Sequence, residues 1–110
     1  MNSKALVLPA KPSLQDYQAY VTEAVRLRGF EDETVPEVFT LLVEEVGELA
    51  KAIRKQNGQK VDAASRQHDV EEEAADVLFL LIDVANRLNI DLAKAFSEKE
   101  AKNKKRIWSA

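Results

Sequence analysis

The sequence predicts an all-α fold with four helices. Apolar residues recur at the three- and four-residue spacing of a helix in four segments, and a capping residue precedes each of them. The 110 residues include only three Gly and three Pro, which is little material for the tight turns of a small all-β fold. A chain of this length has room for one domain. We therefore expect an N-terminal arm over residues 1–12 and a single domain over residues 13–110.

Each predicted helix has a start signal, and most have a stop signal. The four helices are expected over residues 14–28, 35–56, 70–89 and 92–106. Capping boxes are predicted at three of the starts, formed by Ser13 with Asp16, Thr34 with Glu37 and Asp69 with Glu72, and Asp91 is expected to cap the last helix. Gly29 and Gly58 follow the first two helices. Residues 58–68 are polar and lack a strong period, so we expect a loop there.

Acidic residues are concentrated in two short windows. Sixteen Lys and Arg against nineteen Asp and Glu give a net charge of −3. Twelve of the nineteen acids lie in residues 31–48 and 69–76, which contain no Lys or Arg. Residues 98–106 have the opposite character, with five bases and two acids. The mild net acidity gives no reason to expect nucleic-acid binding.

The composition also limits the class of protein. The chain has no Cys, which excludes a disulfide framework and a thiolate metal site. No apolar run reaches the roughly 18 residues that span a bilayer. The first twelve residues lack the long apolar core of a secretory signal. We therefore expect a cytoplasmic protein without a membrane partner.

Carboxylates interrupt the apolar stripe of the second predicted helix. At about 100° per residue, one apolar arc is formed by Leu41, Leu42, Leu49, Ala52 and Ile53, and Val38 and Val46 extend it. Glu45 falls inside this arc and Glu48 lies at its edge, one turn further on. Glu44 lies beyond Glu48, on the more polar side.

The third predicted helix repeats this arrangement. Its apolar stripe consists of Val70, Val77, Leu80, Val84 and Leu88. Glu73 lies in the middle of that stripe, and Asp76 lies at its flank one turn further on. Burying several facing carboxylates is costly, so either bases neutralise them or they hold cations. Lys51 and Lys55 lie near the acids of the second helix, but no base lies beside Glu73.

A divalent cation is the simpler of these two solutions. The candidate ligands are all carboxylate oxygens, which favours Mg²⁺, with Mn²⁺ as a substitute, over Zn²⁺ or copper. A di-iron bundle would require Glu-x-x-His motifs, which this chain lacks. Mg²⁺ held by carboxylates usually completes its coordination with water and substrate phosphates. This pattern therefore indicates phosphoryl or nucleotidyl chemistry.

The order of these acids resembles a known family. Residues 44–48 (EEVGE) followed by residues 73–76 (EAAD) are similar to the EExxE…ExxD signature of the MazG-like nucleoside triphosphate pyrophosphohydrolases, the all-α NTP pyrophosphatases. A third element, Lys99-x-x-x-Asn103-x-x-Arg106, resembles the last-helix pattern of that family, and the resemblance covers about residues 14–107. Two departures are the long polar segment before the third helix, and Asn89 where relatives often have Gly.

The resemblance implies Mg²⁺-dependent hydrolysis of a nucleoside triphosphate to the monophosphate and pyrophosphate. Carried over by position, the metal ligands are Glu45, Glu48, Glu73 and Asp76. Glu44 matches the first Glu of the motif, whose role is either to activate the attacking water or to help hold a second metal. The side chains implied to bind phosphate share one helix face and are Lys99, Asn103 and Arg106. Phe30 matches a base-stacking aromatic of the family, although a packing role fits it equally, and His68 is read as a surface or capping residue.

The third helix also indicates an oligomer. Leu78, Ile82 and Ala85 give it a second apolar face, so that it is apolar nearly all round. Such a helix must be buried on every side, which a single four-helix chain of this size cannot readily achieve. We therefore expect the third helix in a subunit interface. The resemblance implies a four-helix MazG-like bundle assembled as a dimer, or as a tetramer built from two dimers.

Two other functions remain open from the sequence. The first is a non-enzymatic helical interaction module whose acids bind a basic partner. The second is a pyrophosphohydrolase of a phosphoribosyl nucleotide intermediate. The leading hypothesis is a nucleoside triphosphate pyrophosphohydrolase that removes unwanted nucleotides from the pool.

Overall fold

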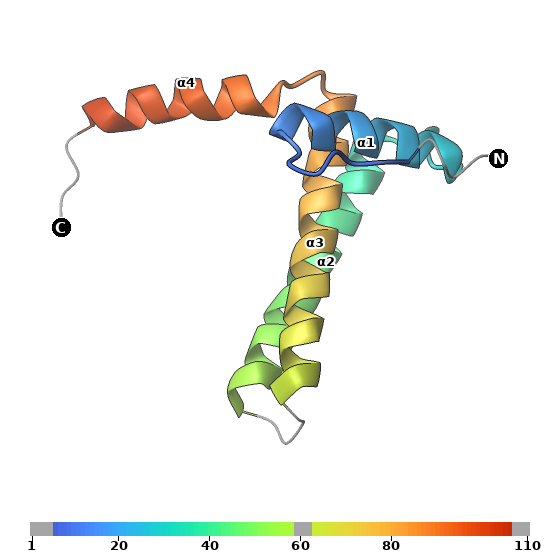
Figure 1. Cartoon of the computed structure of the whole chain (residues 1–110), viewed down its shortest axis with the longest axis vertical. Helices are drawn as coiled ribbons and strands as arrows, with labels where there is room; N and C mark the ends of the chain where they lie inside the picture. Colours follow the sequence, from blue (N-terminus) through green and yellow to red (C-terminus); the bar gives the residue numbers. More distant parts are fainter. Residues whose placement is uncertain (1–5, 59–62, 107–110) are drawn as a thin grey trace.

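The regular structure consists of α-helices. The computed structural model describes residues 6–58 and 63–106, with side chains throughout except at residues 63–68. The helices are α1 (Leu14–Leu27), α2 (Val35–Gly58), α3 (Ala63–Arg87) and α4 (Leu92–Lys105), and the described residues form no strand (Figure 1). This confirms the prediction of an all-α chain with four helices. None of the described helices combines the length and the apolar character needed to cross a bilayer.

The helices are arranged as an open T-like shape. α2 and α3 form a long antiparallel hairpin that provides most of the contacts between helices. α1 lies across the end of this hairpin at which α2 begins and α3 ends, and it packs mainly on α3 (Figure 1). α4 leaves the same end and extends away from the hairpin, with contacts chiefly to α1. The four described helices therefore do not close into a bundle within one chain.

The helix starts follow the predicted capping chemistry. The backbone N–H of Asp16 donates to Oγ of Ser13 at 3.1 Å, and the Ser13 N–H donates to the Asp16 carboxylate at 2.8 Å. Thr34 and Glu37 form the same reciprocal pair before α2, at 3.3 and 3.0 Å. At α4, the carboxylate of Asp91 accepts the N–H of Lys94 at 3.2 Å. These bonds satisfy donors that a helix cannot pair internally.

A left-handed residue ends the α3 segment. Asn89 has φ of 57°, and the N–H of Ile90 donates back to the carbonyl of Ala85 at 2.9 Å. Asn tolerates this conformation better than most residues, which explains why Asn89 can occupy a position that favours Gly. The Gln18 side chain of α1 then joins this turn to α4, because its amide donates to the Ile90 carbonyl at 2.8 Å and accepts the Leu92 N–H at 3.0 Å.

The predicted start of α3 is wrong. The helix begins at Ala63, so residues 63–68 are helical where a loop was expected, and Asp69 lies inside the helix with Glu72 instead of capping it. An apolar period reports burial against a partner and not helicity itself, so a polar helix end is missed. Two consecutive Ala, the strongest helix formers, open this segment, and it contains no Gly or Pro. The side chain of His68 and residues 59–62 lie outside the described residues.

The core lies where α1 crosses the hairpin. Val21 and Val25 of α1 and Ile82 of α3 form its buried centre, and the residues packed around them are Tyr17, Tyr20, Phe79 and Leu92. Along the predicted stripe of α2, Val38, Leu42 and Ala52 are buried, whereas Leu41, Val46 and Ile53 remain 38%, 47% and 43% exposed. The apolar stripe of α2 is therefore wider than α3 alone can cover.

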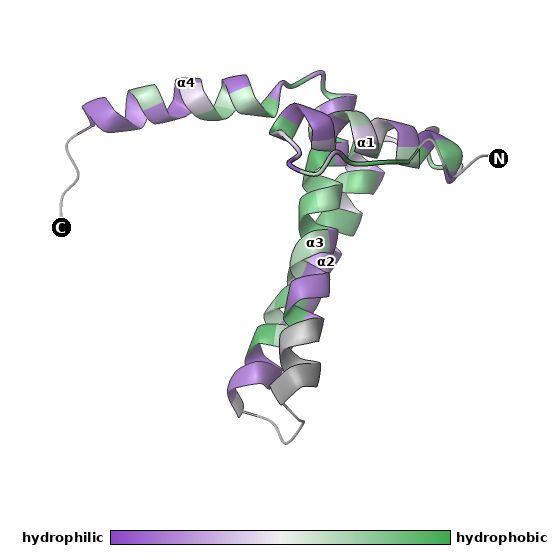
Figure 2. Cartoon of the chain, viewed as in Figure 1, coloured by the Kyte–Doolittle hydropathy of each residue, from purple (hydrophilic) through white to green (hydrophobic). Residues whose placement is uncertain are grey.

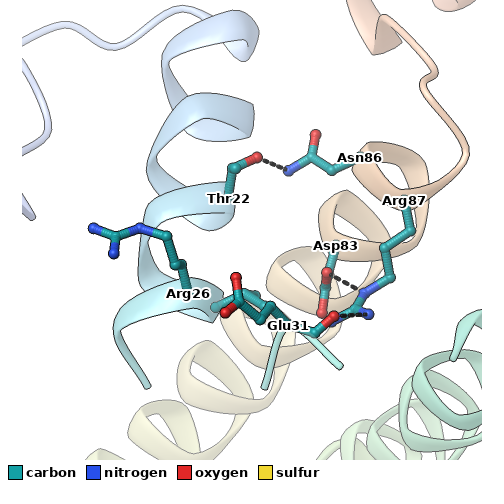
Figure 3. Close-up of a pocket in the computed structure, with 7 residues that line it drawn as sticks. Thr22, Arg26, Glu31, Asp83, Asn86 and Arg87 are labelled. Atoms are coloured by element: carbon teal, nitrogen blue, oxygen red, sulfur yellow. Dashed lines mark hydrogen bonds and ion pairs between the residues drawn. The ribbon is translucent and has the colours of Figure 1, made fainter. Parts of the chain in front are cut away.

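A buried ion pair fastens the connection between α1 and α2 to α3. Arg87 contacts Asp83 on its own helix, and its guanidinium also donates to backbone carbonyls of Phe30, Glu31 and Glu33. Figure 3 shows Asp83 and Arg87 beside a cavity of about 210 Å³ that α1 also lines. The segment that precedes α2 is thus held in a defined position over the hairpin.

Candidate functional site

Three carboxylates converge between α2 and α3. Glu45 comes from α2, and Glu73 and Asp76 come from neighbouring turns of α3. One oxygen from each side chain lies within 4.8 Å of the other two. Glu45 and Glu73 are half-buried and Asp76 is exposed. The two acid-bearing stripes identified in the sequence therefore face each other across the hairpin.

The electrostatics of this cluster are unfavourable without a counter-charge. Hydrogen bonding to Glu45 is the largest cause that raises the pKa of Glu73 above its ordinary value, followed by burial and by the charges of Glu45, Asp76 and Glu48. The Oε2 atom of Glu73 is buried and has no hydrogen-bond partner among the residues that the structure describes. A buried, unpaired carboxylate oxygen among like charges is a costly arrangement in an empty protein.

The residues present fit a hard divalent cation. A bound cation would give the buried Glu73 oxygen its missing partner, and it would cancel the repulsion that raises the pKa of Glu73. The donor set consists of carboxylate oxygens, which suits Mg²⁺ or Mn²⁺. Exposed acidic groups are common without any ion, so it is the buried oxygen that distinguishes this cluster.

The other two acids of the motif lie near the cluster. Glu48 is exposed and contributes to the raised pKa of Glu73, but its oxygens are not among the three that converge. Glu44 is also exposed, one turn before Glu48 on the outer side of α2. The structure thus brings together three of the four predicted ligands, with Glu48 beside them.

Two cavities of about 180 Å³ each flank the carboxylates along the hairpin. The first lies towards α1 and is mainly apolar, with a wall formed by Val25, Arg28, Phe30, Glu33, Leu41, Phe79, Leu80 and Asp83. Phe30 is 52% exposed there, and the guanidinium of Arg28 lies 5.5 Å from the ring centre of Phe79. The second cavity lies towards the tip of the hairpin and is polar, lined by Glu48, Lys51, Ala52, Lys55, Asp69 and Glu73.

The predicted phosphate-binding residues of α4 lie elsewhere. Lys99 and Asn103 line a largely apolar groove of about 460 Å³ between α1, α3 and α4. Arg106 follows the last helical residue and has an extended backbone, so it does not continue the helix face of the other two. Within one chain, these three side chains line neither of the cavities beside the carboxylates.

Sequence reasoning missed two contributors to the cavities. From the sequence, Lys51 and Lys55 were assigned only as bases near the acids. They follow Glu48 at positions i+3 and i+7, so the three side chains share one side of the helix, and this spacing could have placed both lysines at the site. Phe79 was given no role in the site from the sequence, yet it lines the apolar cavity with Phe30. Both cavities depend on how α2 and α3 face each other, which spacing within one helix does not give.

Comparison with known proteins identifies a family and several relatives. A model of the MazG nucleotide pyrophosphohydrolase domain matches residues 33–108. "Uncharacterized protein YpjD" of Bacillus subtilis is 44% identical over 55 residues, which is 49% of this chain and 50% of that protein. Two proteins named "dATP/dGTP diphosphohydrolase" also match. The one from Salmonella phage PMBT28 is 36% identical over 74% of this chain, and the one from Cyanophage S-2L is 38% identical over 62%.

The chain spans only part of these relatives. The matches cover 50% of the Bacillus protein, 23% of the Salmonella phage protein and 52% of the cyanophage protein. The family model, in contrast, covers α2, α3 and α4 and all five acids of the two motifs. The match therefore includes both sides of the carboxylate cluster. On these grounds, the chain belongs to the MazG nucleotide pyrophosphohydrolase domain family.

Proposed function

We propose that this chain is a Mg²⁺-dependent nucleoside triphosphate pyrophosphohydrolase that converts a (deoxy)nucleoside triphosphate to the monophosphate and pyrophosphate. The observation that carries the proposal is the convergence of Glu45, Glu73 and Asp76, in a chain of this family, around a buried oxygen that has no partner within the described part of the chain. The names of the two phage relatives make dATP and dGTP the first substrates to test. The proposed cellular role is the removal of unwanted nucleotides.

The proposed chemistry assigns separate roles to the acids. Glu45, Glu48, Glu73 and Asp76 would hold Mg²⁺, which when bound supplies charge neutralisation and a lowered water pKa. Glu44, which is exposed next to Glu45, would accept a proton from the attacking water. The water oxygen forms a bond to the α-phosphorus. The bond from that phosphorus to the bridging oxygen breaks, and its electron pair leaves with pyrophosphate.

The apolar cavity is the proposed base site. Phe30 and Phe79 offer aromatic surface there, and Leu41 forms part of the wall one helical turn before Glu45. Nucleobases stack on aromatic side chains. A base in this cavity would leave its α-phosphate near the carboxylates, as the reaction requires.

A second copy of the chain is the proposed cover for the apolar surface of α3 and α4. Leu78, Leu81 and Phe96 line the groove between these helices and are 44%, 45% and 68% exposed. Figure 2 shows apolar residues along α2 and α3 outside the crossing with α1. α4 contains no buried residue. A homodimer, or a tetramer built from two dimers, would bury this surface and close the helices into a bundle.

The deciding experiment offers canonical and modified nucleotides with Mg²⁺ and measures pyrophosphate and orthophosphate separately. We expect pyrophosphate as the primary product, and we expect turnover to be abolished in Glu45→Gln and Glu73→Gln, which keep the side-chain size but remove a charged ligand. Glu71→Gln, an exposed position on the same helix, is the matched control and should retain activity. Orthophosphate as the first product, or near-normal turnover in either site variant, would contradict the proposal.

Mg²⁺ titration separates the enzyme from an interaction module. A ligand that binds only the folded state raises the unfolding temperature. We expect the unfolding temperature to rise with Mg²⁺ in the wild-type chain and to stay constant in Glu73→Gln. A flat response of the wild-type chain with nucleotide present would favour a non-enzymatic role.

A further inference from the structure

The polar cavity contains two lysines that have no role in the proposed chemistry. Lys51 and Lys55 stand one turn apart on α2, and both line the cavity next to Glu48. We propose that these two ammonium groups bind the terminal phosphates of the nucleotide, which become the leaving pyrophosphate. The inference rests on the proposed function and assigns it a phosphate subsite within the same chain.

The polar cavity carries both negative and positive side chains, which suits a ligand that contains a cation and an anion together. Its walls carry the carboxylates of Glu48, Asp69 and Glu73 together with the two lysines. Neither lysine forms an ion pair or a hydrogen bond within the part of the chain that the structure describes. A complex of a divalent cation with a polyphosphate meets both needs, because the carboxylates face the metal and the ammonium groups face phosphate oxygens.

The order of features along the hairpin matches the order of groups in a nucleotide. From the α1 end, the hairpin presents the apolar cavity, then the carboxylate cluster, then the polar cavity. With a rise of 1.5 Å per residue, Leu41 stands about 6 Å from Glu45 along α2, and Lys51 stands about 9 Å beyond Glu45. A base in the apolar cavity and an α-phosphate at the carboxylates direct the terminal phosphates towards the lysines.

The lysines also fit the reaction chemically. When the bond between the α-phosphorus and the bridging oxygen breaks, negative charge increases on the departing pyrophosphate. Ammonium groups near that charge stabilise it. A lysine acts on phosphate mainly as a point charge, so its removal weakens binding of the terminal phosphates and leaves the base site intact.

The test measures binding of pyrophosphate in the presence of Mg²⁺, by calorimetry, alongside binding of a nucleoside monophosphate. The variants are Lys51→Ala, Lys55→Ala and the double variant. Arg54→Ala is the matched control, because Arg54 is an exposed base on the same helix that lines neither cavity. We expect the double variant to bind pyrophosphate at least about tenfold more weakly. Monophosphate affinity and the Arg54→Ala variant should remain unchanged.

Two further measurements make the outcome decisive. Lys51→Arg with Lys55→Arg should recover a large part of the pyrophosphate affinity, because charge is retained. The same calorimetry on Lys99→Ala and Arg106→Ala tests the last-helix residues as the phosphate site. Unchanged pyrophosphate affinity in the Lys51 and Lys55 double variant would overturn the inference. A loss confined to the last-helix variants would assign the terminal phosphates to those residues instead.

A wrong phosphate subsite and a wrong reaction assignment give different results in these experiments. If the wild-type chain releases no pyrophosphate from any nucleotide but binds added pyrophosphate through the two lysines, the reaction assignment is wrong and the anion site stands. If the wild-type chain is an active pyrophosphohydrolase and the lysine variants bind pyrophosphate normally, only the subsite is wrong. Thermal unfolding of each variant checks that the fold is retained.

Discussion

The Nε atom of Arg87 donates to the carboxylate of Asp83, one turn earlier on α3, at 2.8 Å. The two side chains are only 14% and 7% exposed. The same guanidinium donates to the carbonyl of Phe30 at 2.8 Å. A single arginine therefore joins the buried acid of α3 to the connection that carries Phe30, and the wall of the apolar cavity depends on it.

Loss of this arginine should destabilise the whole chain. Arg87→Ala leaves the buried Asp83 carboxylate unpaired, and breaking such a pair costs about 3–5 kcal/mol of unfolding free energy. Urea unfolding measures the change. Arg26→Ala is the control, because Arg26 pairs with Glu23 on the exposed surface of α1, where ion pairs contribute little. Equal stability of the two variants would contradict the structural role of Arg87.

Removing a charge from the carboxylate cluster should stabilise the metal-free protein. Glu73→Gln removes the negative charge that burial and the charges of Glu45, Asp76 and Glu48 disfavour, and Gln can donate a hydrogen bond to Glu45. We expect a higher unfolding temperature for Glu73→Gln than for the wild-type chain in chelator, and Glu71→Gln should show no such gain. A lower unfolding temperature for Glu73→Gln would mean that the carboxylate is already compensated within the chain.

The stability of the metal-free protein should depend on pH in a direction set by Glu73. Because its folded-state pKa is raised, the folded state binds more protons than the unfolded state between the ordinary carboxyl pKa and the raised value. Stability from this group therefore falls as pH rises through that window. Subtracting the pH profile of stability of Glu73→Gln from that of the wild-type chain isolates the contribution of Glu73. A difference that rises with pH would contradict the prediction.

Mg²⁺ should reverse this pH dependence. Metal ligands must be deprotonated, so binding competes with the extra proton that Glu73 retains. The rise in unfolding temperature caused by Mg²⁺ should therefore increase as pH rises through the raised pKa of Glu73. Calorimetric Mg²⁺ titrations at several pH values check this, and a pH-independent affinity would show that Glu73 does not bind the ion.

The apolar groove of α4 should control assembly. Phe96→Glu places a charge in the groove formed with Leu78 and Leu81, and it should shift a dimer or tetramer towards monomers. The neighbouring Ser97→Glu adds the same charge outside the groove and should leave assembly unchanged. Light scattering at micromolar concentration measures both. A wild-type monomer under these conditions would contradict the oligomer.

The local elements were predictable because their signals are local. The reciprocal bonds of Ser13 with Asp16 and of Thr34 with Glu37 need only a three-residue spacing. The start of α3 failed because polar helical residues carry no apolar period. The convergence of Glu45 with Glu73 was predictable because both interrupt apolar stripes, and two stripes in one small core must face each other.

The cavities and the direction of α4 were not predictable in this way. Lys55 lines the polar cavity together with Asp69 and Glu73 of α3, which depends on how α2 and α3 face each other. The separation of Lys99 from the carboxylates depends on the turn at Asn89 and on the contacts of Gln18. These are relationships between elements, and a period within one helix does not contain them.

The lack of buried residues on α4 has a consequence for hydrogen exchange. A helix of 14 residues that contains no fully buried side chain is marginal in water, so its amides open locally at little cost. The amides of α3 around Ile82, in the buried core, open only with the whole molecule. Amide exchange along α4 should therefore slow when another surface packs on this helix. The residues that become protected would identify the part of α4 that is covered.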